Sequence, residues 1–147
     1  MTKLDDLIAA HPLLFRGAHP LVPSGLPAGW YALVDELCTG IESVLGQDGC
    51  ASFAVMQIKE KCAGMRFYFS LDGAEDRFMD IHSDAGLHTL IQRADGPPAM
   101  DSIRDLVKLA ARASQVTCQK CGAPGKRVVR SGWVAALCGE HAGEKEE

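Results

Sequence analysis

Apolar residues recur at helical spacing in three stretches of the chain. Thr2 could cap the first of these predicted helices, and His11-Pro12 could end it. Pro27 suits the first turn of the second predicted helix, and Gly46 suits its end. The third stretch leads directly into Cys118. Residues 11–27 contain four of the seven prolines and predict an irregular loop. The apolar positions of the three predicted helices are Leu4, Leu7 and Ile8; Trp30, Leu33, Val34, Leu37, Ile41, Val44 and Leu45; and Met100, Ile103, Leu106, Val107 and Ala110.

Between the second and third helices the pattern changes to a period of two. Phe53 and Val55 would share one strand face with Gln57 and Lys59, and residues 65–71 alternate in the same way. The short link at Ala63-Gly64 predicts that these two strands form a hairpin. Residues 77–82 could add a third strand, whereas residues 87–93 are weakly helical in pattern. We therefore expect an α+β body made of a helix, an antiparallel hairpin and a second helix.

Four potential metal ligands stand in two pairs near the C-terminus. Cys118-Gln-Lys-Cys121 and Cys138-Gly-Glu-His141 are separated by sixteen residues. Residues 126–130 and 133–137 read as two short strands around a Ser131-Gly132 turn. This arrangement is typical of a zinc ribbon, in which two tight turns each supply two ligands. We expect a body over residues 1–114, a zinc ribbon-like module over 115–142 and a disordered tail over 143–147.

The ligand count indicates the role of the metal. Three cysteines and one histidine would close a tetrahedral site, so the predicted Zn²⁺ is structural. A catalytic zinc would require His141 to lie outside the coordination sphere and water to replace it. The remaining alternative is that the cysteines are unrelated thiols in a reducing compartment.

Charge and composition narrow the class of partner. The net charge is −4, from 15 basic and 19 acidic residues, which argues against a general nucleic-acid coat. No segment resembles a secretory signal or a bilayer-spanning run, so we expect a cytoplasmic protein without membrane contact. Lys120, Lys126, Arg127 and Arg130 make the ribbon locally basic. That surface could contact phosphate or an acidic partner, or could simply be solvated.

Polar residues on the predicted hairpin form a second candidate site. An amide and two lysines would share one strand face, with an arginine across the turn, an arrangement that suits an anion. Alternatively the face is solvated, or its cations pair with acids of the long helix such as Glu36 and Glu42. The candidate ligand-binding residues are Gln57, Lys59, Lys61 and Arg66.

A third group offers the other possible basis for catalysis, besides an incompletely ligated zinc. Asp80 and His82 would share one strand face, as metal ligands of some hydrolases do, with Asp84 and His88 nearby. No further carboxylate or histidine cluster supports this group, and no G-x-S-x-G, phosphate-binding loop or dinucleotide fingerprint is present. We therefore expect no catalytic residues and no enzyme activity.

Three segments in order resemble a group of small, functionally uncharacterised proteins encoded by bacteriophages and prophages. They are Gly29-Trp30 through Ile41-Glu42, the block Gln57–Tyr68, and Cys118 through His141. In that group the middle block usually reads Q-[VI]-K-E-K-F-G-x-L-R-[FY]-Y. This chain has Cys62 and Ala63 where Phe and Gly are usual, and it is longer between Tyr68 and Cys118. The resemblance implies zinc, a cytoplasmic location and a phage-derived setting, but no activity.

Together these observations predict a zinc-stabilised, non-enzymatic interaction protein. The expected partner is a host macromolecule, a protein rather than nucleic acid, contacted by an apolar patch such as one around Trp133. The resemblance adds the expectation that the chain inhibits a host defence. The alternatives are a nucleotide- or anion-binding protein that sequesters a phosphate-bearing ligand, and a metal-dependent hydrolase.

Overall fold

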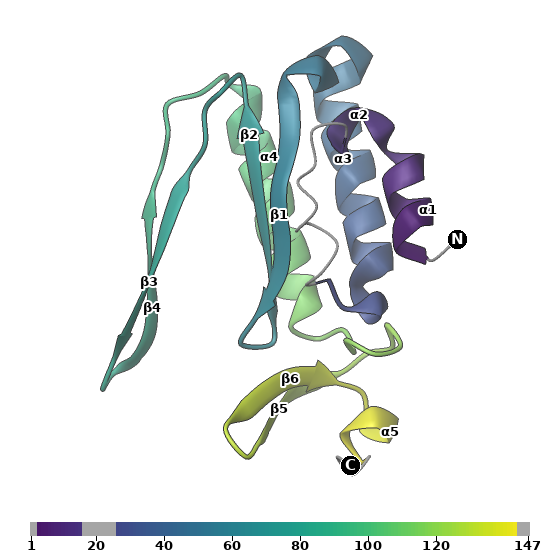
Figure 1. Cartoon of the computed structure of the whole chain (residues 1–147), viewed down its shortest axis with the longest axis vertical. Coiled ribbons are helices and arrows are strands. Elements are labelled where there is room, and N and C mark those ends of the chain that lie inside the picture. Colours follow the sequence, from purple (N-terminus) through teal and green to yellow (C-terminus); the bar gives the residue numbers. More distant parts are fainter. Residues whose placement is uncertain (1–2, 16–25, 144–147) are drawn as a thin grey trace.

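The computed structural model describes residues 3–15 and 26–143 as an α+β protein with helices and small antiparallel sheets (Figure 1). The predicted Thr2 cap, residues 16–25 of the predicted loop, and the predicted tail apart from Gly143 lie outside the described residues. The elements are α1 (Lys3–Ala10), α2 (Pro12–Phe15), the 3-10 turn η1 (Ala28–Trp30), α3 (Tyr31–Gly49), the 3-10 turn η2 (Cys50–Ser52), β1 (Phe53–Lys61), β2 (Gly64–Leu71), β3 (Arg77–Ser83), β4 (Gly86–Gln92), α4 (Ala99–Ser114), β5 (Lys126–Arg130), β6 (Trp133–Leu137) and α5 (Gly139–Ala142).

The three predicted helices are present as α1, α3 and α4. Gly46 has φ 70° and ψ 170°, so the regular part of α3 ends where its glycine predicts. The expectation of a loop over residues 11–27 is wrong at residues 12–15, which form the short helix α2. Leu14 and Phe15 are buried there against the core, so tertiary packing stabilises a turn of helix that the local sequence does not predict.

The β1–β2 hairpin is present but its faces differ from the predicted alternation. Val55 pairs with Phe69 and Gln57 with Tyr68, so β1 holds one extra residue, Met56, in a β-bulge. The bulge reverses the side-chain alternation, and Gln57 does not share a face with Val55 as we expected. Ile58 is buried instead.

The connection between β1 and β2 is a two-residue turn. Cys62 and Ala63 both have positive φ, 52° and 69°. Turns of this kind match the twist of a hairpin but favour Asn-Gly over the residues present here.

The β3–β4 hairpin forms a second two-stranded sheet. The helical expectation for residues 87–93 is wrong, because β4 pairs residue by residue with β3, from Ser83–Gly86 to Arg77–Gln92. In Figure 1 this hairpin leaves the body beside β2 and diverges from it toward its tip. Its inward face contacts the body through Phe78 and Asp80, and its outward face carries Met79, Ile81 and Leu90.

The main core lies between the inner face of the β1–β2 hairpin and helices α3 and α4. Two hydrogen bonds of one histidine fasten the N-terminal helices α1 and α2 to it. The buried ring of His11 lies between Asp35 and Glu42, with nitrogen–oxygen distances of 2.6 and 2.7 Å. The largest fully buried side chains are Trp30, Phe53, Leu14, Ile41, Ile58, Leu71, Met100, Ile103, Val34, Val55 and Cys38. Within the described ranges, no helix combines the length and the apolar character needed to cross a membrane.

At the base of the β3–β4 hairpin, Asp76 accepts hydrogen bonds from Arg104 of α4 at 2.9 and 2.7 Å and from the backbone N–H of Ala94 at 2.9 Å. Arg104 also donates to the carbonyl of Ala94 at 2.8 Å. This cluster joins the two ends of the β3–β4 segment to α4.

Candidate metal centre

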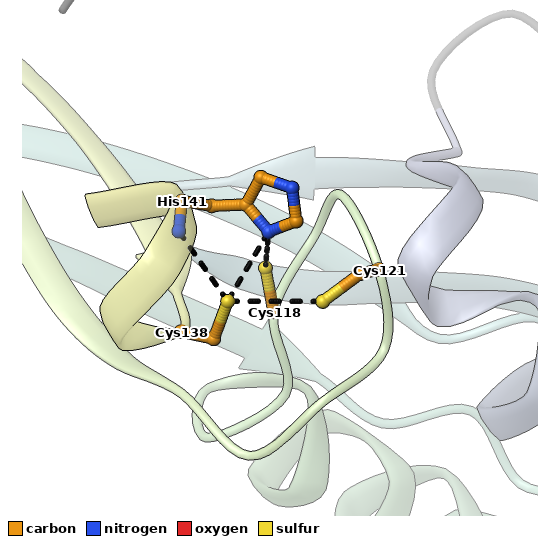
Figure 2. Close-up of side chains that lie close together, drawn as sticks. All are labelled: Cys118, Cys121, Cys138 and His141. Atoms are coloured by element: carbon orange, nitrogen blue, oxygen red, sulfur yellow. Dashed lines mark hydrogen bonds between the residues drawn. The ribbon is translucent and has the colours of Figure 1, made fainter. Parts of the chain in front are cut away.

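The four predicted ligands converge at the end of the molecule formed by β5, β6 and α5 (Figure 2). Cys118 and Cys121 lie in the turn after α4, where Gly122 adopts φ 81° and its N–H donates to the carbonyl of Cys118 at 2.9 Å. Cys138 follows β6 and caps α5, and His141 lies on that short helix. The β5–β6 hairpin forms as predicted and brings the second pair of ligands back to the first.

The ligand atoms of this quartet all lie within 4.8 Å of one another. Nδ1 of His141 is 3.1 Å from the sulfur of Cys138 and 3.5 Å from that of Cys118. The sulfurs of Cys121 and Cys138 are 3.7 Å apart, much farther than the roughly 2.05 Å of a disulfide. The four side chains could therefore bind one metal ion.

The surroundings of Cys118 favour its thiolate form. Burial acts to raise the pKa of this thiol, but the backbone N–H groups of Cys138, Cys121 and Lys120 outweigh it and lower the pKa to about 6. A thiolate is the form of cysteine that ligates metals.

The body holds the quartet in place through its backbone. Gly29 N–H donates to the carbonyl of Gln119 at 2.8 Å, and the indole of Trp30 donates to the carbonyl of Thr117 at 3.0 Å. A Cβ on Gly29 would lie 2.0 Å from the carbonyl oxygen of Cys118, so this approach requires glycine. Gln119 also bonds Ala136 of β6 through both its backbone N–H and its side-chain oxygen.

The predicted anion-binding row lies on the face of the β1–β2 hairpin that looks toward the β3–β4 hairpin. Arg66 donates to Asp80 at 3.2 Å, and the ammonium of Lys61 is 3.9 Å from the same carboxylate. The ammonium of Lys59 lies 5.5 Å from the centre of the Tyr68 ring. The acids that we considered as partners, Glu36 and Glu42, do not occupy this face; Glu42 pairs with His11.

Asp80 thus belongs to a contact between the two hairpins. It accepts hydrogen bonds from Thr89 at 2.8 Å and from Arg66, and these two partners hold its pKa below the usual range. His82 shares the inward face with Asp80, as predicted, but His88 pairs opposite Ile81 and lies on the outward face. In the part of the chain that the structure describes, the Cys/His quartet is the only group of three or more potential ligands close enough to hold a metal.

The ribbon presents basic and aromatic side chains to solvent. Lys120, Lys126 and Arg127 are exposed, and Trp133 is 44% exposed. Both a phosphate group and an acidic partner could reach these exposed side chains.

Sequence reasoning missed the contacts that join distant segments. The pair Asp76–Arg104 spans 28 positions and the pair His11–Glu42 spans 31. Among the residues that make such long-range contacts, only Gly29 and Trp30 are marked in the sequence, because the Gly29-Trp30 dipeptide is part of the resemblance described above.

Comparison of the chain with protein-family models, with curated proteins and with solved structures finds no match.

Proposed function

We propose that the chain is a zinc-stabilised, non-enzymatic interaction protein that binds a protein partner through the outward face of the β3–β4 hairpin. One observation carries the proposal. Met79, Ile81 and Leu90 share that face and are 62, 39 and 56% exposed. Contiguous exposed apolar side chains mark protein-binding surfaces, because leaving them in water is unfavourable unless a partner covers them.

The geometry of the quartet supports zinc as the metal. Metal–sulfur bonds of about 2.3 Å and metal–nitrogen bonds of about 2.0–2.1 Å give tetrahedral edges of roughly 3.8 Å between sulfurs and 3.6 Å between sulfur and nitrogen. The sulfurs of Cys121 and Cys138 are 3.7 Å apart, and His141 Nδ1 lies 3.5 Å from the sulfur of Cys118, both near these edges, whereas the 3.1 Å between His141 Nδ1 and the sulfur of Cys138 is shorter. Three thiolates and one imidazole are also a usual ligand set for structural zinc.

The same ligand set argues for a structural ion. A site filled by four protein ligands leaves no coordination position for a substrate or for an activated water. Bound zinc would tie the turn of Cys118 and Cys121 to α5, and would stabilise the ribbon against the body.

The partner and the setting follow from the resemblance to phage and prophage proteins. We propose a host protein as the partner and the bacterial cytoplasm, where thiols stay reduced, as the compartment. Inhibition of a host defence is the purpose that such a setting favours.

The alternative is an anion- or nucleotide-binding protein that uses Gln57, Lys59, Lys61 and Arg66. The contact between Arg66 and Asp80 weighs against it, because the carboxylate already lies where a phosphate would bind. The two functions differ in salt dependence, since binding of a phosphate-bearing ligand to a basic surface weakens steeply as salt rises.

The proposal is tested by affinity purification from bacterial lysate with a matched pair of variants. Met79→Ser/Leu90→Ser removes the apolar outward face, whereas Val129→Ser changes a residue of equal exposure, 62%, on the ribbon. We expect a protein captured by the parent and by Val129→Ser to be lost with the double variant. A partner retained by the double variant, or a nucleotide that co-purifies instead of a protein, would refute the proposal.

A further inference from the structure

Strand β2 has one edge that no strand covers in the described part of the chain. It pairs with β1 on one side, and the β3–β4 hairpin forms a separate sheet. The backbone N–H of Met65 donates to Ser114 Oγ of α4 at 2.9 Å, and that of Leu71 donates to the carbonyl of Ala74 at 3.0 Å. Neither acceptor belongs to β1, so these two N–H groups point to the other edge.

Strand geometry places two more N–H groups on that edge. Backbone groups alternate in direction along a strand, so those of Phe67 and Phe69 point the same way as those of Met65 and Leu71. Within residues 3–15 and 26–143, neither Phe67 nor Phe69 has an acceptor outside the β1–β2 ladder. The edge is therefore closed at both ends by Ser114 and Ala74 and open between them. Unpaired backbone groups in a largely buried strand are unfavourable unless water or a partner satisfies them.

A cavity lies along this open edge. Its volume is about 260 Å³, and it extends between α4 and the inward face of the β3–β4 hairpin. Phe67 and Phe69 line it from β2, Phe78 and Ile91 from the hairpin, and Val107 from α4. A strand added to a sheet lies about 4.8 Å from its neighbour, so it would occupy this space.

The charges around the cavity are predominantly positive. Four cations line it, Arg66, Arg93, Arg104 and Lys108, against the single acid Asp76. Arg66 and Arg104 are paired with acids, as described above. Arg93 and Lys108 are exposed and form no ion pair with another described residue. An acidic segment would be attracted here, whereas a second copy of the same edge would be repelled.

We propose that the open edge of β2 takes up an extended, acidic segment of a partner protein as a third strand. The segment would pair with the backbone groups of Phe67 and Phe69, and its acidic side chains would meet Arg93 and Lys108. This mode of binding draws its affinity from main-chain hydrogen bonds and its specificity from flanking side chains. The inference rests on the proposed function and names the chemistry of the partner that the chain would bind.

Amide hydrogen exchange measured by NMR on the whole zinc-loaded protein tests the edge directly. The amides of Tyr68 and Ser70, which face β1, are internal references for those of Phe67 and Phe69. In dilute free protein we expect Phe67 and Phe69 to exchange on the order of tenfold faster than the references. Equal protection of all four amides in dilute protein would overturn the proposal, and so would protection that appears only as protein concentration rises, because a second copy would then cover the edge.

The occupant is tested with capped heptapeptides in which glutamate alternates with valine. We expect this peptide to bind and to slow exchange at Phe67 and Phe69. A lysine-for-glutamate peptide, and a glutamate peptide N-methylated at alternate amides, should bind on the order of tenfold more weakly. An Arg93→Glu/Lys108→Glu variant should bind the glutamate peptide more weakly by a similar factor, whereas Lys126→Glu on the ribbon should not change its affinity.

Equal binding of the three peptides, no binding by any of them, or an unaffected Arg93→Glu/Lys108→Glu variant would overturn the proposal. None of these results depends on Met79 and Leu90, so the edge can fail while the proposed function stands.

Discussion

A single methyl group at Gly29 should separate the ribbon from the body. In a Gly29→Ala variant the new Cβ would lie 2.0 Å from the carbonyl oxygen of Cys118 and 2.6 Å from the carbonyl carbon of Gln119. Ordinary contact begins at 3.4 Å, so one backbone must move by about 1.4 Å, the difference between 3.4 and 2.0 Å. Both obstacles are backbone atoms, and no side-chain rotation can relieve the clash.

The cost can be worked from the contacts that such a shift would break. Two hydrogen bonds hold the ribbon at this point, from Gly29 N–H to Gln119 at 2.8 Å and from the Trp30 indole to Thr117 at 3.0 Å. Each contributes about 0.5–1.5 kcal/mol. Overpacking by one methyl group independently suggests about 1–3 kcal/mol. We expect the free energy of unfolding to fall by about 2–3 kcal/mol, which corresponds to roughly 6–10 °C in Tm for a chain of this size.

Urea unfolding of the zinc-loaded protein, followed by tryptophan fluorescence, measures this loss. Trp30 is fully buried, and a Trp133→Phe background removes the second, exposed fluorophore. Gly139→Ala is the matched control, because it too adds a single methyl group, here on the ribbon itself, and its Cβ would meet nothing within 4 Å. If Gly29→Ala unfolds within about 0.5 kcal/mol of the parent, the ribbon is not docked as described.

Three further predictions concern the metal, a turn and a part-buried ion pair. Cys121→Ser should lower bound zinc below half an equivalent by elemental analysis and unfold at least the ribbon; full occupancy would contradict the quartet. Cys62→Asn removes an exposed thiol that is not one of the four ligands, so the variant should keep its zinc, and it should gain up to about 1 kcal/mol in urea because Asn tolerates φ 52° better; a loss of stability would contradict the strained turn. Asp76→Asn should cost about 2 kcal/mol at pH 7 by removing the charge that the part-buried Arg104 bonds, although Arg104 keeps its contact with Asp101 at 2.8 Å, and it should cost less at pH 3; a cost that does not change with pH would refute this account.

The sign of the pH effect follows from the hydrogen bonds of Asp76. Donation by Arg104 and by the Ala94 N–H keeps the folded-state pKa of this carboxyl below its unfolded value, despite the opposing effect of burial. A depressed pKa stabilises the fold at pH values above the unfolded pKa of about 3.9. That contribution is lost as the pH falls through the folded-state value, so parent and variant should converge in acid.

The features that could be predicted from the sequence are those encoded locally. The quartet of Cys118, Cys121, Cys138 and His141 depends on ligand spacing and on turns of a few residues, and all four side chains converge as expected. Helices α1, α3 and α4 follow from their apolar spacing in the same way.

The features that could not be predicted depend on distant partners. The pattern of residues 87–93 is weakly helical, and only pairing with β3 makes them a strand. The bulge at Met56 has no local signature, and it turned the row of Gln57 and Lys59 to the face opposite Val55. The carboxylate of Asp80 reaches Arg66 only because the two hairpins lie face to face.

The contact between Trp30 and Thr117 also sets an order of events during synthesis. The two residues are 87 positions apart, so at about 5–20 residues per second a ribosome adds Thr117 some 4–17 s after Trp30. During that interval the carbonyl that the indole bonds does not exist, and η1 lacks the segment that Gly29 and Trp30 bond. A metal ion cannot be held by all four side chains of the quartet until His141 has followed. The nascent chain therefore holds an incomplete body for seconds, and the ribbon cannot dock on Gly29 and Trp30 before Thr117 and Gln119 have been added.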